Sequence, residues 1–457
     1  MDKKRGMPAI APAAAEPLEI LDRLLAQAKA RGADAADAVC IDRRSLSVAY
    51  RLGSREQLER SETQVIGLRL FVGLRQAIVS SSDISPAALD EMLERGVAMA
   101  HAVPEDPYCG LADPSDIGCA DVDVEACESG EPDAEVVSAR AAQAEAAALA
   151  VIGVSNSEGA EASAGIDRTA IAASNGLRRS YARSWHGFSV SVLAGAGTAM
   201  ERDYEYASAV WQSDLADPAV LGRRCGERAV RRLHPRKARS AQVPVVYEPR
   251  VARGLLGHLT AAINGSAVAR GTTFLGDKLG VPVFAPGINI FDDPLRKRGP
   301  RSRPCDGEGI ASVRRALIDD GRLTTWLLDL RSARQLGLRS TGHGSRGVSS
   351  PPSPAPSNVY LQPGNLSASA LIAGIDDGLL VTDLMGFGIN GVTGDYSRGA
   401  SGFWIERGEI AYPVSEITVS GNLLQMFRQL TPASDLEFRY GIDSPTLRID
   451  GMTVAGR

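Results

Sequence analysis

Residues 376–430 read DDGLLVTDLMGFGINGVTGDYSRGASGFWIERGEIAYPVSEITVSGNLLQMFRQL. The stretch joins apolar, strand-like runs with closely spaced glycines, and it presents Asp395, Tyr396, Ser397 and Arg398 together on a glycine-flanked segment. Glycine is the residue that a chain uses where the backbone takes a positive φ or approaches another backbone closely. This density of glycines therefore predicts a shaped surface built from strands and turns.

A Gly-x-Gly-x-x-Gly pattern occurs within this stretch, at Gly386, Gly388 and Gly391. A dinucleotide site needs that pattern to follow a strand and to open a helix, with an acidic residue about 20 positions later. Here Gly-Asp-Tyr-Ser-Arg-Gly follows, and then the strand-like residues 403–405. The sequence therefore favours turns and sheet crossings over nucleotide binding.

Length and composition indicate an ordinary globular protein with more than one core. At 457 residues and 48.2 kDa the chain exceeds one usual core, so we expect two domains. The hydrophobic fraction of 44% and the charged fraction of 23% are typical of globular chains. A net charge of −5 disfavours a general nucleic-acid binder.

The cysteines form no tight cluster and no Cys-x-x-Cys pair. They are Cys40, Cys109, Cys119, Cys127, Cys225 and Cys305. In a chain of this size the pattern favours free thiols in a reducing compartment over a disulfide framework or a zinc ribbon.

The amino terminus has basic residues, but prolines and Glu16 interrupt the apolar core that a secretory segment needs. We expect residues 1–17 to form a disordered lead-in. The longest run of small apolar residues, 146–154, falls well short of the ~20 residues that span a bilayer. The sequence therefore predicts a soluble, cytoplasmic protein without a membrane segment.

Residues 18–235 read as an amino-terminal α+β domain. Helical spacing predicts helices at 18–28, 86–99, 133–151 and 217–233, and alternating or apolar runs predict strands at 36–42, 45–51, 64–72, 76–80, 161–169, 171–174, 178–194 and 199–208. Between them, the acidic, Pro-rich segment 101–135 carries three cysteines in no ligand pattern, so a solvated connecting segment is the favoured interpretation.

The helix ending near residue 233 opens the most basic part of the chain, from Arg223 to Arg239. It has an apolar face and lacks aromatic residues for stacking, so a solvated face or a subunit contact is favoured over nucleic-acid binding. We place a domain boundary near Pro235, and residues 241–457 read as a mainly β carboxy-terminal domain with a few helices. Asp320-Gly321 and Arg407-Gly408 are its predicted hairpin turns. The fold class is thus α+β with two domains.

Several long motifs then resemble one family. They are GINGVTGDYSRGASGFWIERGEIAYPVSEITVSGNL at 388–423, STGH at 340–343, RPCDGEG at 303–309, GLLGHLTAAINGSAVARGT at 254–272 and the strands at 67–85. Together they resemble the TldE (PmbA) branch of the TldD/PmbA family, over nearly the whole chain from about residue 18 to residue 456.

The resemblance implies a subunit that joins a sister chain, TldD, in a cytoplasmic metallopeptidase acting on unfolded or peptide substrates. The sister branch carries a His-Glu-x-x-x-His zinc motif on a helix and a cysteine ligand near its carboxy terminus. At the matching positions this chain has His258, Leu259 and Ile263, and no cysteine follows Cys305. Catalytic zinc needs about three protein ligands and a nearby base. We therefore expect no catalytic residue and no metal ligand in this chain, with zinc in the partner.

Other candidate residues have weaker signals. His343 could join a distant Ser and Asp in acyl transfer, but there is no Gly-x-Ser-x-Gly turn, so a loop histidine that bonds backbone or faces a partner is favoured. Asp306 and Glu308 could act as acid and base, although local turn bonding by Asp is commoner on such a loop.

The sequence thus predicts a non-catalytic subunit that lines a shared chamber and binds extended peptide. Asp395, Tyr396, Ser397, Arg398 and His343 are its candidate substrate-binding or interface residues. A homodimer in the absence of the partner stays open. The alternative is a stand-alone binding or regulatory protein of the kind named in the family as a modulator of DNA gyrase.

Overall fold

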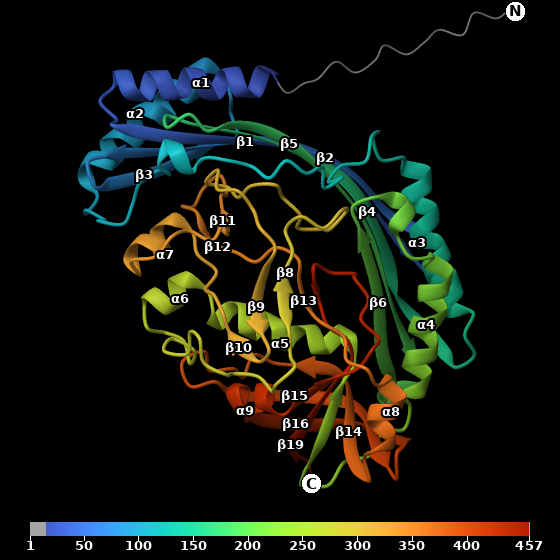
Figure 1. The fold of residues 1–457 in the computed structure, drawn as a ribbon. Coiled ribbons are helices and arrows are strands. Elements are labelled where there is room, and N and C mark those ends of the chain that lie inside the picture. Colours follow the sequence, from blue (N-terminus) through green and yellow to red (C-terminus); the bar gives the residue numbers. More distant parts are fainter. Residues whose placement is uncertain (1–14, 457) are drawn as a thin grey trace, which may run out of the picture.

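The computed structural model describes residues 15–456, and a long curved sheet arches over the carboxy-terminal half of the chain (Figure 1). Helices and strands are mixed throughout, so the predicted α+β class is confirmed. The lead-in predicted for residues 1–17 lies outside the described residues except for its last three. Those three belong to the first helix, α1 (Ala15–Ala30).

The amino-terminal sheet is antiparallel with the order β3-β2-β1-β4-β5-β6. Its strands are β1 (Ala35–Arg51), β2 (Ser54–Val72), β3 (Arg75–Ser81), β4 (Val154–Ala173), β5 (Arg178–Ala194) and β6 (Glu201–Ala209). The two short strands predicted at 36–42 and 45–51 are one strand. Arg43 and Arg44 stay in the sheet because β2 and β4 pair with the backbone on both sides of them.

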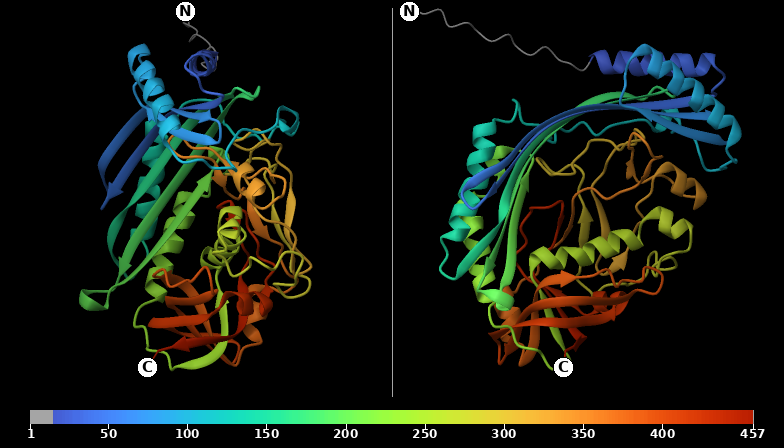
Figure 2. Two further views of the ribbon diagram at one scale, coloured as in Figure 1. Left: turned by 90° about the vertical axis from the view of Figure 1, so that its left-hand side faces the viewer. Right: turned by 180° about the vertical axis from the view of Figure 1, so that it is seen from behind.

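Helices cover the outer, convex face of this sheet at its two ends (Figure 2). At one end α1 and α2 (Pro86–Ala102) bury Leu21 and Leu93 against Leu68 of β2. At the other end α3 (Ala134–Leu149) and α4 (Pro218–Arg231) pack small residues and Leu221 against Val190 of β5. The predicted helices are therefore present, and each buries an apolar stripe as its spacing requires.

The segment between α2 and α3 keeps nearly all of its side chains exposed or half-buried, but its backbone is attached to the rest of the fold. Its backbone pairs with both halves of the chain: Gly118 donates to Gly309 at 2.8 Å, and the carbonyl of Ala126 accepts from Ser184 of β5 at 3.1 Å. Cys119 also forms a disulfide with Cys305. The prediction of free thiols is therefore wrong for these two cysteines, because folding brings together positions 186 residues apart.

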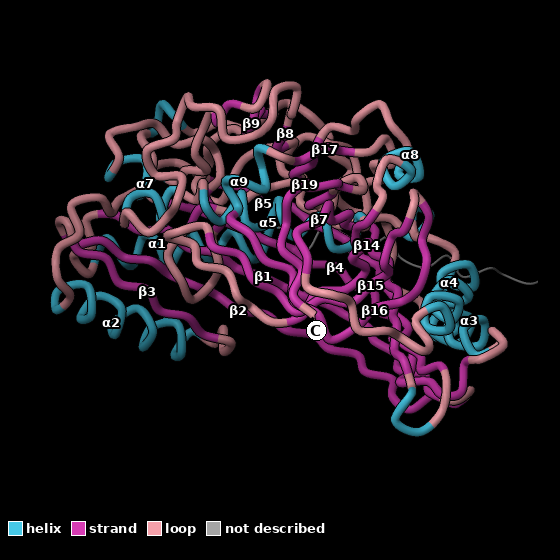
Figure 3. Tube along the Cα trace, turned by 90° about the horizontal axis from the view of Figure 1, so that it is seen from below, coloured by secondary structure: helices cyan, strands magenta, loops and turns pink. Residues whose placement is uncertain are grey.

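The carboxy-terminal sheet has the order β16-β15-β14-β7-β19-β17, and β16 also pairs with β19, so the sheet closes on itself. This sheet lies below the amino-terminal sheet in Figure 1, and Figure 3 shows the two from below. The strands of the carboxy-terminal sheet are β7 (Ala241–Tyr247), β14 (Asp377–Met385), β15 (Asp395–Glu406), β16 (Glu409–Asn422), β17 (Leu430–Pro432) and β19 (Leu447–Ala455). The predicted turn between β15 and β16 is confirmed, with φ of 52° at Arg407 and 81° at Gly408.

A smaller sheet with the order β10-β9-β8-β13-β18 and a short pair, β11-β12, complete the carboxy-terminal half. Their bounds are β8 (Ile290–Asp292), β9 (Arg315–Asp319), β10 (Arg322–Leu323), β11 (Gly344–Ser345), β12 (Ser353–Pro354), β13 (Val359–Leu361) and β18 (Ile442–Asp443). The helices there are α5 (Pro249–Ala262), α6 (Gly265–Ala269), α7 (Leu330–Gln335), α8 (Ala368–Ala373) and α9 (Leu423–Arg428). The predicted hairpin at Asp320-Gly321 joins β9 to β10.

The glycine pattern at 386–391 lies in the loop between β14 and β15, and no helix opens after it. A Cβ at Gly388 would lie 2.1 Å from the carbonyl oxygen of Ser397. Glycine is therefore required by the close approach of two backbones, as the turn interpretation predicts.

Among the helices that the structure describes, none combines the length and apolarity that crossing a bilayer demands.

Candidate functional site

Helix α5 places His258 on the carboxy-terminal core. Pro249 occupies the first turn of the helix, where the missing N–H costs no hydrogen bond. Leu255, Leu256 and Leu259 recur at helical spacing and are buried. The helix thus packs one apolar face into the core, and His258 lies half-buried beside that face.

His258 meets residues from β15. Its ring lies edge-on to Tyr396, with ring centroids 6.1 Å apart and planes at 70°. Burial lowers the pKa of His258, and the positive charge of Arg398 lowers that pKa further. At neutral pH the imidazole is therefore neutral, with one nitrogen able to accept a hydrogen bond and one able to donate.

The four consecutive residues Asp395 to Arg398 do not form one surface. Alternation along β15 buries Tyr396 to 2% exposure and leaves Asp395 and Ser397 exposed. Asp395 accepts a hydrogen bond from Thr393 at 2.6 Å, and Arg398 donates to the carbonyl of Met385 at 3.1 Å. The structure brings Tyr396 and Arg398 to His258 and separates the other two from it.

His343 lies in a loop and is 3% exposed, so its side chain points into the core and not toward a partner. Its Nε2 lies 2.6 Å from Asp292 Oδ2, and its Nδ1 lies 2.7 Å from the hydroxyl of Thr341. Although burial opposes ionisation, the hydrogen bonds from His343 and Ser357 hold the pKa of Asp292 below its usual range. The imidazole fixes loops of the core, and its burial leaves no room for an acyl-transfer substrate.

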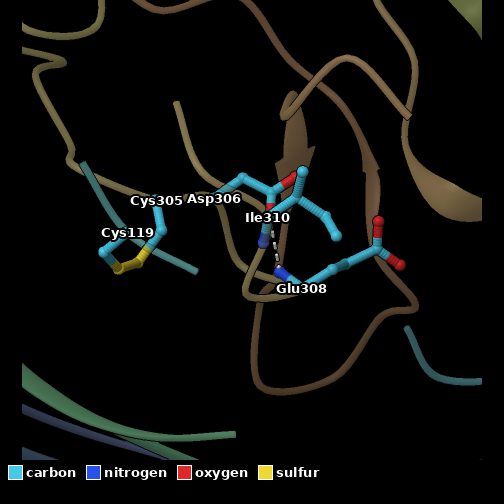
Figure 4. The surroundings of a disulfide bond; sticks show 5 residues. All are labelled: Cys119, Cys305, Asp306, Glu308 and Ile310. Carbon is cyan, nitrogen blue, oxygen red and sulfur yellow. Dashed lines mark hydrogen bonds between the residues drawn. A yellow bond between two sulfur atoms is a disulfide. The ribbon is translucent and has the colours of Figure 1, made fainter. Parts of the chain in front are cut away.

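Asp306 and Glu308 lie on the loop beside the disulfide (Figure 4). Asp306 accepts from the backbone N–H groups of Glu308 and Ile310 at 2.9 and 3.0 Å, which is the predicted local turn bonding. Glu308 accepts from the N–H of Leu330 at 2.8 Å. Burial raises the pKa of both carboxyl groups, and the neighbouring Asp306 helps to raise that of Glu308 to about 8. The pair is therefore built to hold a proton at neutral pH.

Three arginines in and directly after α4, Arg224, Arg228 and Arg232, bind carboxylates of the same chain. Arg224 and Glu205 form two hydrogen bonds of 3.0 Å, and Arg232 lies 3.3 Å from Asp203. These pairs fasten α4 to β6, whereas Arg223 and Arg231 stay on the exposed face of the helix.

Comparisons with known proteins define the family. Profiles described as PmbA/TldA metallopeptidase domain 1, central domain and C-terminal domain match residues 36–100, 127–233 and 240–456. The chain is 37% identical to "Metalloprotease PmbA" of Escherichia coli O157:H7 over 435 residues, which cover 95% of this chain and 94% of that protein. The chain belongs to the PmbA/TldD metallopeptidase family.

Solved PmbA/TldD structures agree with the fold. A candidate modulator of DNA gyrase from Bacteroides thetaiotaomicron superposes with a TM-score of 0.89 at 26% identity, covering 97% of this chain and 99% of that one. TldE from Thermococcus kodakarensis gives a TM-score of 0.82 at 19% identity, covering 96% and 100%. The chain is also 26% identical to the "Metalloprotease TldD homolog" of Haemophilus influenzae over 218 residues, which cover 44% of this chain and 45% of that protein.

The residues of α5 do not fit the zinc that a PmbA/TldD metallopeptidase needs. Leu259 and Ile263 are completely buried in the core, and neither side chain carries a donor atom. Over residues 15–456, no group of three His, Cys, Asp or Glu side chains lies close enough to hold a metal ion. A single half-buried imidazole supplies one of the roughly three protein ligands that catalytic zinc takes.

A group of arginines that no sequence motif indicated lies around one cavity of this PmbA/TldD fold. Arg179 and Arg183 come from β5, and Arg301 and Arg303 come from the loop before the disulfide. The alternation of Arg179, Tyr181 and Arg183 along a strand was the available signal, because side chains two positions apart share a face. Nothing in the sequence paired that face with residues 301–303.

Proposed function

We propose that the chain is the non-catalytic subunit of a two-chain zinc metallopeptidase, in which a TldD-like partner holds the metal. The observation that carries the proposal is the donor set of α5. Leu259 and Ile263 occupy the positions at which the sister branch has Glu and a second His. Both are part of the core and contribute no metal ligand. Similarity to a TldD homologue over part of the chain supports a partner of that type.

In this pair the chain contributes one wall of a chamber that admits unfolded or peptide substrates. The charge of Arg398, near the start of β15, acts on the neutral imidazole of His258 on α5. Such groups can form hydrogen bonds with the backbone carbonyls and carboxylates of a peptide, whatever its side chains are. This suits an enzyme that acts on substrates of many sequences. The proposal includes a cytoplasmic location, in keeping with the family resemblance, and self-association when the partner is absent.

The test compares the chain alone, the TldD-like chain of the same genome alone, and the two co-expressed. Zinc content is measured by mass spectrometry, and hydrolysis is measured on an unfolded protein with and without chelator. We expect zinc and hydrolysis only where the TldD-like chain is present, and a copurifying pair. A matched control pairs this chain with a TldD-like variant whose zinc-binding histidines are replaced.

Stoichiometric zinc in the isolated chain, together with chelator-sensitive hydrolysis, would overturn the proposal. A stand-alone regulatory role is the alternative, and it predicts no copurifying TldD-like chain. Two arginines of the basic segment, Arg224 and Arg232, are engaged with Glu205 and Asp203, which lowers the charge available to nucleic acid there.

A further inference from the structure

A cavity of about 1030 Å³ lies between the amino-terminal sheet and the carboxy-terminal half. One wall is formed by residues of β4 and β5, and the facing wall is formed by the loop at 300–307. Figure 2 shows that the concave face of the amino-terminal sheet is turned toward the carboxy-terminal half. Residues 119–127 of the acidic segment form a further side. His258 and Tyr396 do not line this cavity, so it is separate from the group on α5 and β15.

Four arginines of the cavity wall have no carboxylate partner. They are Arg179, Arg183, Arg301 and Arg303. Arg183 donates to the backbone carbonyls of Pro300 and Ser302, and Arg303 donates to that of Ala355 at 3.1 Å. In the part of the chain that the structure describes, residues 15–456, none of the four forms an ion pair.

Among the described residues, four acidic residues line the cavity, and three of them are engaged elsewhere; the fourth, Asp123, is exposed and accepts the N–H of Glu125 at 2.8 Å. Asp167 binds Arg43 through two hydrogen bonds of 2.7 Å. Glu125 binds Lys297 at 2.7 Å and Arg298 at 2.8 Å. Asp306 accepts backbone N–H groups. The guanidinium groups therefore leave uncompensated positive charge in the cavity.

The charge of Arg183 is costly where it lies, because burial lowers the pKa of this arginine and the neighbouring Arg303 lowers that pKa further. Buried charges are normally paired, and an arginine fork fits a carboxylate with two parallel hydrogen bonds. An anion entering the cavity would supply the missing partner.

Apolar groups in the same wall indicate that this anion is organic. Ile171 and Leu177 are buried on the concave face of the sheet, and Tyr181 and Trp211 also line the cavity. The volume lies at the upper end of the range for small-molecule sites, which is room for a short peptide rather than for a single inorganic ion. Tyr181 and Arg301 are exposed, so the cavity opens to solvent on their side.

We propose that this cavity binds an acidic peptide segment, whose carboxylates pair with Arg301 and Arg303 at the mouth and with Arg183 further in. The choice of a peptide rests on the proposed function, whereas the choice of an acidic ligand rests on the arginines alone. The cavity would hold the acidic part of a substrate away from the metal of the partner subunit.

The test is calorimetric titration of the isolated full chain with an acidic hexapeptide of alternating Glu and Leu, and with its twin in which Gln replaces Glu. We expect the acidic peptide to bind at least about tenfold more tightly than the twin, because a hydrogen bond to a charged group contributes about 1.5–3 kcal/mol. Binding should weaken as salt is raised. Arg301→Gln/Arg303→Gln should lose that preference.

The matched control is Arg223→Gln/Arg339→Gln, which removes the same charge from exposed arginines outside the cavity and should bind like the natural chain. Arg301→Gln alone serves as a second variant, because that side chain makes no hydrogen bond whose loss could unfold the loop. Thermal unfolding of each variant confirms that it is folded.

Equal binding of the two peptides, or unchanged binding by the double variant, would overturn the inference. Stronger competition by inorganic phosphate or by a single-stranded oligonucleotide than by the acidic peptide would also overturn it. If the two-chain complex hydrolyses peptide bonds but this chain does not bind the acidic peptide more tightly than its twin, only this inference is refuted. Hydrolysis by the isolated chain would refute only the proposed function.

Discussion

At the scale of single residues, Glu308 shows how burial changes the chemistry of an ordinary side chain. Its carboxyl group lies close to Asp306, on a loop held by backbone N–H groups from Gly344 and Leu330. The folded pKa of Glu308 is about 8, against an ordinary value of about 4.3. Between these values the folded chain holds a proton that the unfolded chain has lost, so the free energy of unfolding falls as pH rises through that window.

The variant Glu308→Gln keeps the shape and the acceptor oxygen of the protonated acid without its titration. We expect its melting temperature to exceed that of the natural chain by about 2 °C at pH 8.5, with little or no advantage at pH 5. Thermal unfolding measured from pH 5 to pH 9 checks this. Glu56→Gln removes an exposed carboxylate and should leave the pH dependence unchanged. Parallel curves for Glu308→Gln and the natural chain would refute the prediction.

Sequence reasoning reached part of this site. The glycine neighbours of Asp306 predict its turn, which the hydrogen bonds confirm. The burial of Glu308 and its proton were not predictable, because they depend on Gly344 and Leu330, which come from other loops.

At the scale of elements, small residues set how closely the helices pack. A Cβ built on Gly222 of α4 would lie 2.0 Å from the carbonyl oxygen of Ala144 in α3. The two helices therefore touch through their backbones. Gly254 of α5 has nothing within 4 Å of the same position, so its surroundings are open.

These two glycines predict opposite effects of the same substitution. Gly222→Ala should destabilise the chain by about 1–3 kcal/mol, because α4 must move away from α3. Gly254→Ala should stabilise it by up to about 1 kcal/mol, because alanine has the higher helix propensity. Chemical denaturation of both variants measures the difference. A shift of the same sign in both would contradict the close packing of α3 and α4.

At the scale of the whole molecule, the disulfide fastens the acidic segment to the carboxy-terminal half. Cys119 and Cys305 both line the cavity below the amino-terminal sheet. The acidic composition of the segment predicts a solvated connection, but its backbone forms hydrogen bonds with both halves of the chain. Composition alone does not show which distant residues a segment contacts.

Cys119→Ser should lower the free energy of unfolding by about 2–4 kcal/mol, because the link closes a long loop in the unfolded chain. Cys109→Ser removes a nearby free thiol and is the matched control. Denaturation without reductant should separate the two variants, and addition of reductant should bring the natural chain to the stability of Cys119→Ser. Labelling of all six cysteines in the unreduced, unfolded chain would contradict the link.

The sequence by itself determined the four amino-terminal helices, the hairpins at Asp320 and Arg407, the family, and the presence of a lone imidazole, His258, at the position where the sister branch has its zinc motif. These follow from local period, turn chemistry and residue identity, which need no distant partner. Only the tertiary structure decided the pairing of Cys119 with Cys305, the division of the Asp395 to Arg398 stretch between two faces, and the gathering of unpaired arginines. Burial and charge pairing are set by residues far apart along the chain, and the fold alone brings those residues into contact.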